Sequence, residues 1–527
     1  MNKWLKRFLI SFGALILVIS AFGLYFNYYW VNNELPKIIN EKNKSPYFIT
    51  YKNLHVSLLT ATIKASDITV VPKAALKDTL HKQGIYATVK SIEVQHFSIW
   101  SLLVSDRIKA SAIVVNKPTV TLYKKDDSKI NYSKSLSSDV VKPFENIINV
   151  SEVKLNNGDV TILYPKNEKP MLRANNISAE LTGIGINDKQ LKRKVPFSYK
   201  TYAFSCDSVF YKPNLQYHVR CGKISTTNAG FSVDKLEYLC DMSRVNFLKS
   251  IDSERDMYNI KVDKLSLEQL SWGFREDDTL FVHSKTVRLD RVNANIYRDK
   301  RKTDDLRKKK LYNALLRDMN FDLRVDTLAV RNSVLEYEEQ NNDVAPGKLR
   351  WSPFNLTALH VYSGFEQKKL PDVQILIDAK FMDVAPLKAN WTLNVLDKSD
   401  GFHIKGSILS FPVERLEQFS KPYMNFSAKG ILDEVYFDFR GNDNGSKGTF
   451  GINYDDLKVT VFQKNDRKKK NRFLSGVANL FVKNDTKEKV KRTEIEVERE
   501  KDKSFYNMFW KSIAEGLKKI MVSEKLG

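Results

Sequence analysis

Apolar and polar residues alternate with a period of two along most of the chain from Pro46 onward. Toward the C-terminal end, the apolar positions of this alternation are Phe402, Ile404, Ile408, Val435, Phe437, Phe439, Val459 and Val461. The positions between them are mostly polar, as His403 and Lys405 show. Successive side chains of a β-strand point to opposite faces, so the pattern predicts a sheet with one apolar face and one wetted face.

One block of this pattern occurs twice. Residues 89–98 and 112–123 are matched by residues 262–271 and 286–297, so that Tyr123 corresponds to Tyr297, 174 positions later. The matched positions share apolar character and turn placement, whereas charged and nucleophilic residues do not recur. A repeated scaffold has this signature, and we predict two related halves, 47–255 and 256–465.

A shorter unit recurs inside the block, in which an apolar position is followed seven to nine residues later by a tyrosine. The four pairs are Val115 with Tyr123, Leu155 with Tyr164, Leu289 with Tyr297, and Val330 with Tyr337. Turn-forming residues such as Asn156, Asn157 and Gly158 lie between the members of a pair. These positions predict hairpins formed in series.

The predicted fold is therefore mainly β: a long, twisted, antiparallel sheet of repeated hairpins. Its apolar face has to be hidden in a sandwich, in a barrel, or in a groove whose lining holds acyl chains. The eight apolar positions named first are candidates for lipid contact, and ordinary core packing is the alternative for each. Short helices are expected at Pro412–Phe419 and within Asp304–Met319.

The N-terminus predicts a membrane anchor. Lys3, Lys6 and Arg7 precede an uncharged run from Phe8 to Val31, which is long enough to cross a bilayer. The basic flank is expected in the cytoplasm, with residues 32–46 as a neck and the bulk of the chain in the periplasm. A signal peptide cleaved near residues 20–23 is the alternative.

The C-terminus changes character. Residues 466–503 form a charged linker with a short apolar segment, and residues 504–527 predict an amphipathic helix. One face of that helix carries Phe505, Phe509, Ile513, Leu517 and Ile520, with Trp510, Lys511, Lys518 and Lys519 beside it. Three roles are open: Phe505, Phe509, Trp510 and the three lysines contact a membrane surface, the helix covers the end of the sheet, or it binds a partner protein.

The net charge of +23 indicates a negatively charged partner. For a body held outside the cytoplasm, phospholipid or another anionic lipid is expected rather than nucleic acid. The basic runs Arg301–Lys310 and Lys468–Lys470 could contact such lipid or form a solvated face.

No pattern of catalytic chemistry is found. The seven histidines are scattered, no Cys-x-x-Cys occurs, and the glycine-rich stretch Gly441–Gly448 has the wrong spacing for a phosphate-binding loop. That stretch predicts a hairpin loop. We expect no catalytic residue, metal or cofactor and predict that the protein is not an enzyme. Cys206 and Cys221 would form a disulfide if they flanked a hairpin, and are otherwise small buried residues.

The chain resembles the AsmA-like superfamily of diderm bacteria, which includes TamB-type proteins. The resemblance lies in the order of its segments and in two stretches, Ile49–Pro72 and Gly406–Val461. It implies an inner-membrane anchor, a periplasmic β-groove, and a role in moving phospholipid to the outer membrane or in outer-membrane homeostasis. The charged C-terminal tail departs from the best-known members. A non-enzymatic envelope scaffold or assembly factor for outer-membrane proteins is the alternative function.

Overall fold

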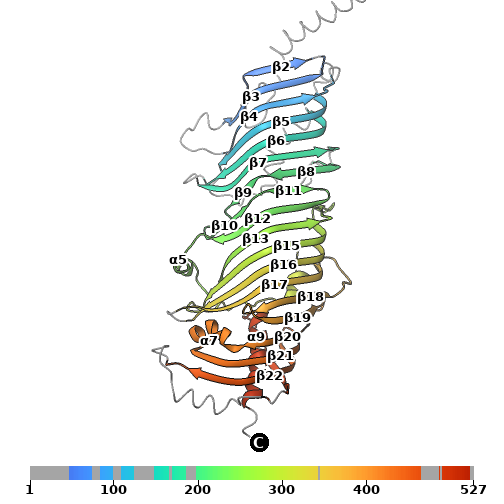
Figure 1. Ribbon diagram of the computed structural model, residues 1–527. Coiled ribbons are helices and arrows are strands. Elements are labelled where there is room, and N and C mark those ends of the chain that lie inside the picture. Colours follow the sequence, from blue (N-terminus) through green and yellow to red (C-terminus); the bar gives the residue numbers. More distant parts are fainter. Residues whose placement is uncertain are drawn as a thin grey trace, which may run out of the picture. The chain divides into compact units, whose positions relative to one another are not determined.

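The structure is a computed structural model that describes residues 47–57, 59–73, 84–98, 108–123, 148–164, 169–184, 197–341, 345–463, 486 and 489–522. It confirms a mainly β fold (Figure 1). The predicted anchor at 1–31 and neck at 32–46 lie outside the described residues. Within the described residues, no helix combines the length and the apolar character that crossing a bilayer requires.

The chain divides into two compact units, unit 1 with residues 1–212 and 222–228, and unit 2 with residues 213–221 and 229–527. The domain limits predicted from the sequence repeat stay a prediction.

Unit 1 is a series of hydrogen-bonded strands. Its described strands are β1 (Tyr47–Thr50), β2 (Asn53–Ser57), β3 (Thr62–Pro72), β4 (Gly84–Gln95), β5 (Ile108–Tyr123), β6 (Ile148–Leu163), β7 (Pro170–Thr182), β8 (Thr201–Cys206), β9 (Ser208–Tyr211) and β11 (Ile224–Thr227). From β3 to β7 each strand pairs with the next along the chain, and all these pairs are antiparallel except the parallel pair β5 and β6.

Unit 2 continues with strands and short helices. It contains β10 (Tyr217–Cys221), β12 (Gly230–Cys240), α5 (Arg244–Lys249), β13 (Asp256–Glu268), β14 (Ser271–Phe274), β15 (Leu280–Asp299), α6 (Tyr312–Arg317), β16 (Asp322–Gln340), β17 (Gly347–Tyr362), β18 (Val373–Phe381), β19 (Ala385–Leu393), β20 (Phe402–Pro412), η6 (Val413–Leu416), α7 (Glu417–Met424), β21 (Phe426–Gly441), β22 (Gly445–Val461), β23 (Lys491–Glu498) and α9 (Phe505–Val522). The short helix expected at Pro412–Phe419 is present as η6 and the start of α7.

The pairing order of unit 1 recurs in unit 2. Strands β12, β13, β15, β16 and β17 pair antiparallel, antiparallel, parallel and antiparallel, which is the order of β3 to β7. A parallel pair needs a crossover connection, and the one between β15 and β16 contains α6. The predicted repetition therefore has a structural counterpart. The predicted purely antiparallel pairing is wrong at the two parallel pairs.

The predicted internal hairpins are single long strands with a bend. Lys117 in β5 and Arg291 in β15 are 174 positions apart, and both have left-handed backbone, with φ of 47° and 51°. Asn157 in β6 and Asn332 in β16 also have left-handed backbone, with φ of 54° and 50°. Asparagine and glycine favour turns because they tolerate left-handed backbone, and the same tolerance serves a bulge inside a strand. The chain therefore bends at these positions without reversing.

The main buried core lies in unit 2. It joins strands β18 to β23 with Leu311 and with Phe505, Met508 and Ile520 of α9. In unit 1 the buried cluster of the described residues is small and contains Val56, Ile63, Val94, Phe97 and Ala110.

Candidate functional site

The described strands of unit 1 carry apolar side chains in rows that run across the sheet. One row, the Leu155 row, follows the pairing from β3 to β8 through Ala65, Ile92, Val115, Leu155, Ala179 and Phe204. Directly paired residues lie on the same face, so these side chains form one continuous strip. All six are half-buried, and no helix lies among the described residues of unit 1.

A second row runs beside the first. It contains Ile63, Val94, Ile113, Val153, Leu181 and Tyr202, each two residues from a member of the Leu155 row. At a strand spacing of about 4.8 Å, five steps between six strands make each row about 24 Å long. The two rows together form an apolar surface of considerable length.

Unit 2 has a row that corresponds to the second row of unit 1, because Val94 and Ile113 match Leu267 and Val287 in the sequence repeat. This Leu328 row follows the pairing from β12 to β19 through Phe231, Leu267, Val287, Leu328, Ala358, Ile375 and Trp391. Leu267, Val287 and Leu328 are half-buried, whereas Trp391 is buried. Burial therefore increases toward the C-terminal strands.

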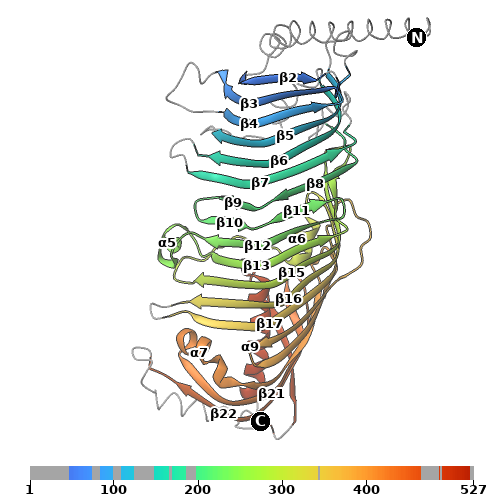
Figure 2. The same ribbon diagram turned by 45° about the horizontal axis from the view of Figure 1, so that its top comes forward.

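Helix α9 covers the row where it becomes buried. The Phe505 ring stacks on Trp391 with 4.3 Å between ring centroids and meets Phe402 edge to face at 5.1 Å. One helical turn later, the Phe509 ring meets Phe437 at 5.2 Å. In both views α9, drawn in red, lies beside the strands of this region (Figures 1 and 2). The helix therefore covers a face of the sheet and not its edge.

The predicted lipid-contact residues lie mainly beneath this helix. Phe402, Ile404, Val435, Phe437 and Phe439 are buried in the core, and Ile408 and Val459 pack against it. Val461 is half-buried at the end of β22, opposite Phe426. Their contact with lipid stays a prediction; in this structure Phe505 and Phe509 of α9 contact Phe402, Phe437 and Phe439.

The predicted membrane-contact residues of α9 separate into two groups. Phe505 is buried and Phe509 packs against the core, so both point inward. Trp510 and Lys518 are exposed. Lys511 forms an ion pair with Glu500, and Lys519 donates to the carbonyl oxygen of Glu494 at 3.1 Å. The predicted contact of these six residues with a membrane is not tested by their placement.

Close packing of α9 depends on a glycine. A Cβ added to Gly516 would lie 2.4 Å from the Cγ atom of Phe450, whose side chain is fully buried. Glycine weakens a helix, and its presence here is explained by the approach of the helix backbone to the sheet.

Ion pairs hold the segment before α9. Arg499, whose side chain is fully buried, pairs with Asp443 and donates to the carbonyl oxygen of Lys309. Lys308 Nζ also bonds Asp443, at 2.7 Å. Burial favours a raised pKa for Asp443, but the hydrogen bond from Lys308 and the charge of Arg499 hold that pKa below its ordinary value. Lys503 Nζ pairs with Asp304 at 2.6 Å.

Side chains of the basic run Arg301–Lys310 pair with nearby carboxylates. Arg301 pairs with Asp299, Arg307 with Asp305, and Lys310 with Asp318, each at 2.7 or 2.8 Å. Neighbouring carboxylates therefore offset much of the run's charge. The surface helix expected within Asp304–Met319 is limited to α6, and Leu311 lies in the core.

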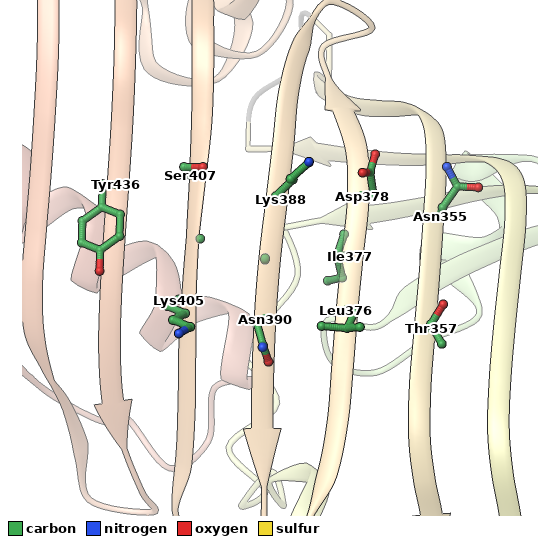
Figure 3. Close-up of a pocket in the computed structure, with 12 residues that line it drawn as sticks. Asn355, Thr357, Leu376, Ile377, Asp378, Lys388, Asn390, Lys405, Ser407 and Tyr436 are labelled. Carbon is green, nitrogen blue, oxygen red and sulfur yellow. The ribbon is translucent and has the colours of Figure 1, made fainter.

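The opposite face of the same strands is slightly hollowed and carries both polar and apolar side chains. A shallow hollow of about 490 Å³ crosses β17 to β21, with Asp378, Lys388, Lys405, Ser407 and Tyr436 among its lining residues (Figure 3). Its lining has mixed charge and no nucleophile held by a base. The described residues contain no cluster of three or more groups suited to hold a metal ion.

Two further predictions have clear outcomes. The glycine-rich stretch is a hairpin loop, because β21 ends at Gly441 and β22 begins at Gly445. The three cysteines are free, so the disulfide between Cys206 and Cys221 is not formed. Cys206 lies opposite Ile224 and is fully buried, as the alternative of small buried residues anticipated, whereas Cys221 is half-buried.

Comparisons with known proteins do not name a family. No protein-family model matches the chain, and no curated protein matches it in sequence. Among solved structures, the crystal structure of the sex pheromone staph-cAM373 precursor is aligned at 9% identity and a TM-score of 0.10, over 63% of this chain and 82% of that one. A similarity of this size does not bear on fold or function.

Proposed function

We propose that the protein is a membrane-tethered, non-enzymatic lipid carrier of the AsmA-like type, whose apolar rows hold the acyl chains of phospholipid in the periplasm. The tether and the location are carried over from the N-terminal sequence pattern. The observation that carries the lipid-binding proposal is the Leu155 row, a strip of half-buried apolar side chains that continues through six strands.

Dimensions support an acyl chain as the occupant. The hydrocarbon core of a bilayer is about 30 Å thick, so one tail spans about 15 Å. The Leu155 row, at about 24 Å, accommodates a tail along its length. Each methylene removed from water contributes about 0.8 kcal/mol, so a half-covered tail is held firmly but without any polar recognition.

The test is a pair of substitutions on β6. Leu155→Glu places a carboxylate in the row, whereas Ser151→Glu places one at an exposed position of the same strand. We expect the native protein and Ser151→Glu to retain phospholipid in native mass spectrometry after gentle purification. Leu155→Glu should lose most of it, because an acyl chain does not solvate the charge.

The outcome separates this proposal from the envelope scaffold. If the unsubstituted protein is well folded by circular dichroism and free of lipid, the carrier proposal fails. If the protein is a scaffold, neither substitution should change its binding to a partner protein.

A further inference from the structure

Four large apolar side chains are exposed together on two neighbouring helices of unit 2. Tyr506 and Trp510 of α9 are 54% and 44% exposed, and Tyr312 and Leu315 of α6 are 37% and 48% exposed. The hydroxyls of Tyr312 and Tyr506 lie 3.4 Å apart, and the Tyr312 ring lies 6.3 Å from that of Phe505. We call this surface the aromatic shelf. Exposed apolar patches of this kind mark binding surfaces.

The shelf is continuous with the Leu328 row. Trp391 ends the row at β19, and its ring meets Tyr312 edge to face at 5.1 Å. The indole N–H of Trp391 is buried and has no hydrogen-bond acceptor among the described residues. The half-buried side chains of Leu267, Val287 and Leu328 are therefore connected to the shelf through Ala358, Ile375 and Trp391, which continue the row into the core.

The outward face of α9 combines apolar and cationic residues. Tyr506, Trp510, Ala514 and Lys518 repeat at intervals of four and are all exposed. Lys518 lies eight positions beyond Trp510, which is about 12 Å along a helix. Between Phe505 and Val522 the helix carries three lysines and one glutamate, a net charge of +2. This arrangement complements a molecule with a hydrocarbon tail and a negative headgroup.

We infer that the aromatic shelf is a binding site for an anionic phospholipid, with the tail over Tyr506 and Trp510 and the phosphate near Lys518. The inference rests on the proposed lipid-carrier function. It adds a binding site for the lipid and the charge of the lipid headgroup. The site uses Tyr506 and Trp510, whose exposed rings lie beside those of Phe505 and Phe509, so the helix binds lipid while it remains packed on the sheet.

The test places a photoreactive benzoylphenylalanine at one of three positions of the full chain. Trp510 reports on the shelf and Leu328 on the row. Leu376 is the matched control, because it is as exposed as Trp510 but lies in the shallow hollow, on the other face of the sheet (Figure 3). Each variant is loaded with phosphatidylglycerol or phosphatidylcholine in mild detergent and irradiated, and lipid adducts are counted by mass spectrometry of the intact chain.

We expect adducts at positions 510 and 328, few at 376, and more with phosphatidylglycerol than with phosphatidylcholine at 510. Lys518→Gln should reduce that preference about fivefold, since one lysine near an anionic surface contributes about 1 kcal/mol.

Other outcomes are distinguishable. Adducts at 328 without adducts at 510 overturn the shelf and leave the carrier function standing. No lipid adduct at either position overturns both. Equal adducts at 510 and 376 would show non-specific lipid contact, and an adduct of twice the chain mass at 510 would assign the shelf to a second copy of the protein. Each of these results overturns the inference.

Discussion

Gly516 shows how one residue determines whether a helix can lie on a sheet. Its position allows the α9 backbone to approach the Phe450 ring, and any larger residue must push the two apart. Helix propensity favours alanine over glycine by about 1 kcal/mol, so propensity alone predicts alanine rather than glycine at position 516.

Gly516→Val should therefore lower the free energy of unfolding of unit 2 by about 3 kcal/mol, the upper part of the usual range for overpacking. Ala514→Val is the matched control, because Ala514 is exposed on the same helix and should change stability by less than about 1 kcal/mol. Denaturant unfolding followed by tryptophan fluorescence measures both. Equal stability of the two variants would contradict close packing at Gly516.

Individual residues also show what the sequence could and could not predict. The spacing of Phe505, Phe509 and Ile513 correctly identified the apolar face of the C-terminal helix, but it did not identify the surface beneath that face. Trp391, which stacks on Phe505, was missed, and only its alternation with Leu393 could have signalled it. Asn157 was interpreted as a turn position, because left-handed backbone is common to turns and bulges.

At the scale of elements, the segment between β23 and α9 works as a clamp. Arg499, Lys501 and Lys503 bond partners on the β15–β16 crossover and on the β21–β22 loop. Apolar contact alone would let an amphipathic helix slide along a smooth face, whereas these ion pairs define its register.

Arg499→Ala should weaken this clamp. Its removal leaves Asp443 without its buried partner, and loss of one member of a buried pair typically costs about 3 kcal/mol. Hydrogen exchange should then rise throughout α9. Arg492→Ala, an exposed arginine of β23, is the control and should leave exchange in α9 unchanged. Unaltered exchange in both variants would show that the ion pairs do not hold the helix.

Acid should act on the same contacts. The pKa values of Asp443 and Asp304 are held below their ordinary values in the folded protein, so their contribution to stability is complete above the ordinary pKa of about 4. It is lost as the pH falls through the lower folded values. We expect protection of α9 from hydrogen exchange to fall below about pH 4 in the native protein. In Arg499→Ala the fall should be smaller; an equal fall would place the acid sensitivity elsewhere.

At the scale of the whole molecule, the two units differ in how their apolar surface is covered. In unit 2 the helix α9 completes a large core, whereas the described strands of unit 1 keep the Leu155 row half-buried. The alternation of the sequence predicted sheets in both. The apolar surface of unit 2 is covered because α9, which begins more than a hundred residues after the last residue of the Leu328 row, packs on the sheet. Local alternation of apolar and polar residues does not specify that contact.

Two separate thermal transitions are therefore expected by calorimetry, with unit 1 unfolding first because less of its apolar surface is buried. Phosphatidylglycerol should raise both transitions, since the proposed binding sites are the Leu155 row of unit 1 and the aromatic shelf of unit 2, and a ligand that binds only the folded state stabilises it. Limited proteolysis followed by mass spectrometry assigns the transitions to the units. A single transition, or a lower transition that belongs to unit 2, would contradict this expectation.

The left-handed residues within the long strands have a consequence for how such a protein could grow. Several long strands contain their own bend, and each set of strands contains its own apolar side chains, so a duplicated gene segment would contain both features. Gene duplication could then add a whole set of strands while the sequences of the existing strands stay unchanged.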